Sequence, residues 1–99
     1  MGQIKDLQSE VHATAREKGW YEKDRNAGEL IALMHSELSE GLEALRHPDD
    51  KENNLGEEMA DVVIRIMDAC EYWNIDLEAE ILKKMEKNRN RPYKHGKKF

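Results

Sequence analysis

Residues 26–46 read NAGELIALMHSELSEGLEALR, and residues 55–73 read LGEEMADVVIRIMDACEYW. In both stretches apolar side chains recur every three or four residues, which is the period of an amphipathic helix. Asn26 and Asn54 stand directly before the two stretches, and each is followed three residues later by a glutamate, as at many helix N-termini. We therefore predict two long helices, the first of which must end before Pro48.

Two further helices are expected, one on each side of this pair. One covers about residues 4–18 and stops at the glycine that follows, with a narrow apolar stripe on one side. The stripe consists of Ile4, Leu7, Val11 and Ala15. The other helix is capped by Asp76, covers about residues 77–90 and is closed by Pro92. Residues 47–53 form a polar loop and no strand-like alternation is present, so the predicted fold class is all-α with four helices.

Length and composition limit the classes of protein further. The chain has 99 residues, of which 37% are charged and 38% hydrophobic, so we expect residues 1–99 to form a single domain in which 92–99 is a basic tail. No uninterrupted apolar run is long enough to cross a bilayer, and residues 1–6 start no signal peptide. We expect a cytoplasmic protein without a membrane partner. Its only cysteine, Cys70, can form no internal disulfide, so stability must come from packing.

The net charge of −5 is unevenly distributed along the chain. Residues 1–82 carry a net charge of −12, and residues 83–99 carry +7. An acidic body repels phosphate backbones, which makes nucleic acid an unlikely partner. The same division is compatible with a site where acids hold cations and bases hold anions.

The helix predicted over residues 55–73 is apolar over more than half of its circumference. A helix of this kind is usually buried on several sides, so we expect self-association into a helical bundle, most simply a two-fold dimer. The alternative is that the other three helices of the same chain cover it.

Two acidic pairs lie at helical spacing on the two central helices. Glu37 and Glu40 are three residues apart, as are Glu58 and Asp61, so each pair points to one side of its helix. Glu37 falls in the middle of the apolar face, where an isolated charge costs on the order of several kcal/mol. A cluster of carboxylate oxygens suits a hard cation such as Mg²⁺ or Mn²⁺. The alternative is an ion-pair network in which Arg65 neutralises the acids, and spacing alone does not decide between them.

Near the C-terminus, three polar side chains lie at spacings of four and three along the fourth helix. Lys84, Asn88 and Arg91 can all donate hydrogen bonds to phosphate oxygens, beside the expected core face. The alternative is a basic helix end that stabilises the helix dipole. Trp20 offers a face for stacking a nucleobase, although a tryptophan after a helix stop more often covers a core.

Taken in order, residues 35–46, 57–65 and 84–92 contain a Glu-x-x-Glu, a Glu-x-x-Asp and a Lys/Asn/Arg element. This ordered set resembles the MazG-like all-α nucleoside triphosphate pyrophosphohydrolases. The resemblance implies a four-helix MazG-like unit that associates into an intersubunit helical bundle, as a homodimer or homotetramer. It also implies a Mg²⁺-dependent enzyme, with Mn²⁺ as a possible substitute, that hydrolyses a (d)NTP to (d)NMP and pyrophosphate.

Carried over residue by residue, the resemblance assigns the metal ligands and the phosphate contacts. The former are Glu37, Glu40, Glu58 and Asp61, and the latter are Lys84, Asn88 and Arg91. Glu57 precedes Glu58, and only the three-residue spacing to Asp61 favours Glu58 as the ligand. Glu40, or failing that Glu37, is the candidate to orient the attacking water or take its proton. The competing hypothesis is a non-catalytic helical interaction module that uses its apolar face and its basic tail.

Overall fold

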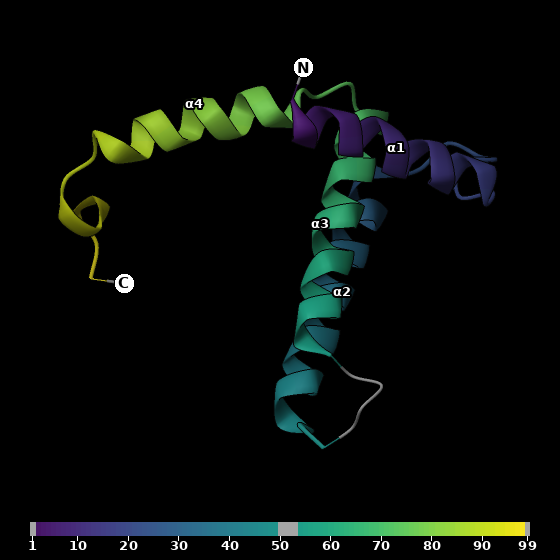
Figure 1. Cartoon of the computed structure of the whole chain (residues 1–99), viewed down its shortest axis with the longest axis horizontal. Helices are drawn as coiled ribbons and strands as arrows, with labels where there is room; N and C mark the ends of the chain where they lie inside the picture. The colour runs from purple at the N-terminus through teal and green to yellow at the C-terminus, as the bar shows by residue number, and fades with distance from the viewer. Residues whose placement is uncertain (1, 50–53, 99) are drawn as a thin grey trace.

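A computed structural model describes residues 2–49 and 54–98 of the chain, and within them all regular secondary structure is helical (Figure 1). The elements are α1 (Gln3–Glu17), α2 (Ala27–Arg46), α3 (Leu55–Tyr72), α4 (Leu77–Arg89) and a short 3₁₀ helix, η1 (Tyr93–Gly96). The expected all-α fold class with four α-helices is therefore confirmed. Residues 50–53 of the expected polar loop and the last residue of the expected tail lie outside the described residues.

At each of the three predicted N-caps, the side chain of the capping residue accepts a hydrogen bond from a backbone N–H group of the helix. The Asn26 side chain accepts from the first turn of α2, Asn54 accepts from Glu57 N–H, and Asp76 accepts from Ala79 N–H. Each bond satisfies a donor that the helix itself leaves without a partner. The Glu29 carboxylate does not complete a capping box, because it pairs with the Arg25 guanidinium instead.

The helices α2 and α3 lie side by side and form the centre of the fold (Figure 1). The side of α2 that is buried against α3 contains Leu30, Glu37, Gly41 and Ala44. A Cβ atom added at Gly41 would lie 2.7 Å from the Met59 methyl carbon and 3.7 Å from the Glu58 Cβ. The absence of a side chain at Gly41 therefore leaves room for the Met59 methyl group, next to the position of Glu58.

Helix α1 packs across the end of this pair, against α3, through a polar contact (Figure 1). The buried residue of α1 is Gln8, whose amide nitrogen donates to the Glu71 side chain and to the Ile75 carbonyl, at 3.0 and 2.7 Å. Of the expected apolar stripe, Ile4, Val11 and Ala15 are partly buried, whereas Leu7 is 47% exposed. The Gln8 amide group, one residue after Leu7, satisfies polar groups at the end of α3.

Helix α4 leaves the helix pair and projects away from it (Figure 1). Its start is held by Glu78, whose Oε1 accepts from the Ile4 and Lys5 N–H groups at the N-terminus of α1, at 3.0 and 3.2 Å. No residue of α4 is buried. Lys84, Asn88 and Arg91 are exposed, so within the described part of this chain they do not border a core.

Because α4 stands apart, the described chain is open rather than a closed bundle. Its radius of gyration is 16.0 Å, against about 13 Å for a compact domain of this length. Large apolar side chains on α2, α3 and α4 are exposed, and they include Ile31, Leu38, Leu42, Leu45, Val63, Ile64, Leu82 and Met85. None of the helices in the described part of the chain combines the length and apolar character that a membrane span requires.

We expect Gly41→Val to destabilise the protein by about 1–3 kcal/mol, because its side chain overpacks the space beside Gly41 that the Met59 methyl group occupies. Urea unfolding followed by circular dichroism measures this free energy. Ser39→Val on the exposed side of α2 is the control, because it introduces the same side chain on the same helix where no neighbour is overpacked. An equal loss of stability in both variants would show that packing beside Gly41 is not the cause.

Candidate functional site

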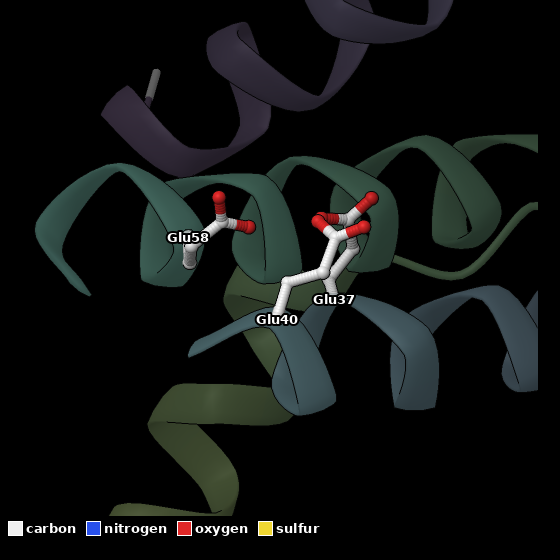
Figure 2. A group of neighbouring side chains, drawn as sticks. All are labelled: Glu37, Glu40 and Glu58. Atoms are coloured by element: carbon white, nitrogen blue, oxygen red, sulfur yellow. The ribbon is translucent and has the colours of Figure 1, made fainter. Parts of the chain in front are cut away.

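Three glutamates converge between α2 and α3 (Figure 2). Glu37 and Glu40 extend from one side of α2 because they are three residues apart, and Glu58 extends from the first turns of α3. One carboxylate oxygen from each residue can be chosen so that all three lie within 4.8 Å of one another. Three of the four predicted metal ligands are thus brought together.

Two of these carboxylates are largely removed from solvent. Glu37 and Glu58 are 8% and 9% exposed, whereas Glu40 is exposed. The Oε2 atoms of Glu37 and Glu58 are both buried without a hydrogen-bond partner. Buried carboxylate oxygens without a donor are unfavourable, so the cluster holds unused ligand capacity.

The crowding changes the acidity of Glu58. Burial raises its pKa from 4.5 to about 7, and the hydrogen bond to Glu40 raises it in the same direction. The negative charges of Glu40, Asp61 and Glu37 add to this effect. Near neutral pH, the Glu58 carboxyl group is therefore partly protonated. A cation at this position would compete with that proton for the carboxylate oxygens.

The ion-pair alternative is realised at one atom of the cluster. The Nε–H group of Arg65 donates to Glu37 Oε1 at 2.8 Å, and the side chains of this pair are 32% and 10% exposed. Arg65 thus neutralises one side of Glu37 and leaves the Oε2 atom facing no donor. Glu37 is compatible with both alternatives at once, since one oxygen is paired and the other is available.

Asp61 lies outside the group of three and takes a neighbouring place. It is partly exposed and lines, with Glu37 and Arg65, a cavity of about 240 Å³ beside the cluster. Glu57, the competing candidate for the ligand position, is exposed, whereas Glu58 lies in the cluster. The placement agrees with the choice of Glu58.

The far wall of this cavity comes from α1 and the segment that follows it. Trp20 and Arg25 line it, with Asp68 of α3 close to them. Trp20 is 54% exposed and has the Arg25 guanidinium carbon 5.9 Å from its ring centroid. Sequence reasoning missed Asp68, although it follows Asp61 by seven residues and therefore lies on the same side of α3.

In a single chain, the predicted phosphate contacts lie apart from the carboxylate cluster and its cavity. Lys84, Asn88 and Arg91 are exposed, on or just beyond the helix that projects away from α2 and α3 (Figure 1). Lys84 lines a groove with Glu80, Lys83 and Lys87 instead. The basic cluster and the acidic cluster of one chain are therefore separate surfaces.

The residues present fit a hard divalent cation. The donors are oxygens only, two buried oxygens have no partner, and the exposed Glu40 leaves the cluster open to solvent on one side. No protein-family model, curated protein or solved structure matches this chain.

We expect the stability of the metal-free protein to fall as the pH rises from about 5 to 8. Folding raises the Glu58 pKa from 4.5 to about 7, so between these values the folded state binds more protons than the unfolded state. The stabilising effect of that proton is present below pH 4.5 and is lost as the pH rises through 7.

Thermal unfolding in EDTA at several pH values measures this dependence. Glu58→Gln keeps a neutral side chain at the position and should flatten the decline, whereas the matched variant of its exposed neighbour, Glu57→Gln, should retain it. A decline of the same size in Glu58→Gln would show that another group is responsible.

Proposed function

We propose that this protein is a Mg²⁺-dependent nucleoside triphosphate pyrophosphohydrolase that converts a (d)NTP to (d)NMP and pyrophosphate. The observation that carries the proposal is the cluster of Glu37, Glu40 and Glu58, with two buried oxygens that lack partners, directly beside a cavity. The resemblance of the ordered sequence motifs supports the same reaction.

In this proposal Glu37, Glu40 and Glu58 hold Mg²⁺ or Mn²⁺, and Asp61 supplies a further carboxylate from the adjoining wall. The bound cation supplies neutralisation of phosphate charge and a lowered pKa for a water ligand. Glu40 is the exposed member of the cluster, so its carboxylate is the one best placed to orient a water molecule that arrives from solvent or to accept its proton. Glu37 is the second candidate for this role, although Arg65 occupies one of its oxygens.

The cavity beside the cluster accommodates the organic part of the substrate in this proposal. Trp20 offers a half-exposed ring at the cavity wall, which supports stacking of a nucleobase, worth about 1–3 kcal/mol per base. The adjoining guanidinium groups of Arg25 and Arg65 add positive charge to a site otherwise dominated by carboxylates.

Self-association is the second element of the proposal, as a homodimer or homotetramer with an intersubunit helical bundle. It is supported by the exposed leucines of α2 and by the open shape of the chain. Because α4 projects away from the acidic cluster of its own chain, we assign Lys84, Asn88 and Arg91 to the phosphates held by a second copy. The charges of the two surfaces are complementary to a metal-bound polyphosphate between them.

A non-catalytic helical interaction module remains the alternative. It is favoured by the same exposed apolar side chains and by the ion pair between Arg65 and Glu37, which partly accounts for the inward-facing acid. This hypothesis predicts no hydrolysis and no Mg²⁺-dependent increase in thermal stability, so the experiment below separates it from the enzyme.

We expect Mg²⁺-dependent release of pyrophosphate from at least one of the eight common (d)NTPs, with product identity resolved by chromatography. Glu37→Gln should lower kcat/KM by on the order of 100-fold or more, because it removes a ligand charge at the cluster. Glu43→Gln is the matched control, since this side chain is exposed on the same helix. Full activity of Glu37→Gln, or no hydrolysis of any nucleotide, would contradict the proposal.

We expect two inactive variants, Glu37→Gln and Lys84→Ala, to complement each other when mixed and allowed to exchange subunits. If the acids and the basic strip of one site come from different chains, a mixed dimer contains one intact site, and random mixing restores about a quarter of the wild-type activity. Mixing Glu37→Gln with Glu58→Gln is the control and should restore nothing. No restoration with Lys84→Ala would contradict the shared site but not the hydrolysis.

A further inference from the structure

A partly buried polar network joins α1, α3 and the segment between α1 and α2, outside the carboxylate cluster. Its centre is Asp68 on α3, whose Oδ1 lies 2.7 Å from His12 Nδ1 and whose Oδ2 accepts from the Tyr21 hydroxyl at 2.8 Å. A carboxylate only accepts hydrogen bonds, so His12 Nδ1 carries the hydrogen in this contact. Both oxygens of Asp68 are thus engaged by groups 56 and 47 residues away in sequence.

The network also orders the aromatic rings around it. The Tyr21 ring lies 4.7 Å from the His12 ring and 4.6 Å from the Tyr72 ring, between centroids. Burial, followed by the hydrogen bond to Asp68, raises the pKa of Tyr21 above its usual value. Tyr21 is therefore a neutral hydrogen-bond donor across the physiological pH range.

A second set of bonds extends this network to the wall of the cavity. The Tyr72 hydroxyl accepts from the Arg25 N–H at 3.0 Å, and the Arg25 side chain donates to the Trp20 carbonyl at 3.0 Å. The segment of residues 18–26 is thus fastened to α3 at Tyr21 and Arg25. Trp20, Arg25 and Asp68 all line the cavity that also contains Glu37 and Asp61.

The residues that fasten the segment share one side of α3 with the residues of the site. Counting along the helix, Glu58, Asp61, Arg65, Asp68 and Tyr72 follow one another at spacings of three and four. A rigid helix therefore sets the distance between the carboxylate cluster and the wall that carries Trp20.

We propose that Asp68 is a positioning residue, which by holding His12 and Tyr21 fixes residues 18–26 as the cavity wall and so sets the affinity for the organic part of the substrate. The role in substrate affinity rests on the proposed function, whereas the fastening of the segment does not. Asp68 takes no part in hydrolysis itself, because both of its oxygens are occupied.

Tyr21→Phe tests this proposal, because it removes one hydroxyl and keeps the ring contacts. Amide hydrogen exchange within residues 18–26 should become about tenfold faster, as expected from losing a hydrogen bond to a charged acceptor, while exchange within α2 stays unchanged. With the nucleotide that the wild type hydrolyses, KM should rise about tenfold at a kcat within twofold of the wild type. Tyr93→Phe, in which the same change is made at a side chain that is 87% exposed, should alter neither quantity.

A second pair of variants distinguishes the loss of one hydrogen bond from a general loss of stability. His12→Asn places an amide nitrogen near the position of Nδ1 and should retain the wild-type KM, whereas His12→Ala should raise it. Unchanged exchange in Tyr21→Phe, or faster exchange with an unchanged KM, would overturn the positioning role. A wild-type protein that hydrolyses no nucleotide would contradict the proposed function, while the exchange result would still decide whether Asp68 holds the segment.

Discussion

The buried carboxylate of Glu37 is the constraint on which the arrangement of the two central helices depends. Its side chain lies in the seam between α2 and α3, where an unpaired charge is strongly unfavourable, and Arg65 compensates only one of its oxygens. Gly41 lies one turn further along α2, beside the Met59 methyl group and the Cβ atom of Glu58. The cluster therefore follows from the helix packing, and its repulsion would be relieved by a proton on Glu58 or by a bound cation.

Much of the fold could be predicted because the signals that set it are local. The caps at Asn26, Asn54 and Asp76 act over three residues, and the inward position of Glu37 follows from helical periodicity. The direction of α4 could not be predicted, because it depends on Glu78 accepting hydrogen bonds from the backbone of α1, more than 70 residues away. A polar contact of this range leaves no periodic pattern in the sequence.

The candidate site divides in the same way. Glu37, Glu40 and Glu58 were predictable as a group because carboxylates at helical spacing share a side of the helix. Asp68 was missed because a single acid on a helix rich in acids carries no signal until its partners, His12 and Tyr21, are known. The polar residues of α3 then form one continuous side, which couples the wall of the cavity to the carboxylate cluster through the helix.

The separation of charge along the chain has its counterpart in space. Three acidic residues, Glu37, Glu40 and Glu58, gather in the seam of α2 and α3, and the basic residues between positions 83 and 98 continue along the exposed α4 and beyond it. None of the large apolar side chains in the described residues is completely buried. The isolated chain therefore gains little stability from its core. Covering the exposed leucines with a second copy would add apolar burial that the single chain lacks, and the folding free energy would then depend on protein concentration. The same contact would bring a basic strip toward an acidic seam, so that stability and the assembly of a site for a metal-bound polyanion would have one physical cause.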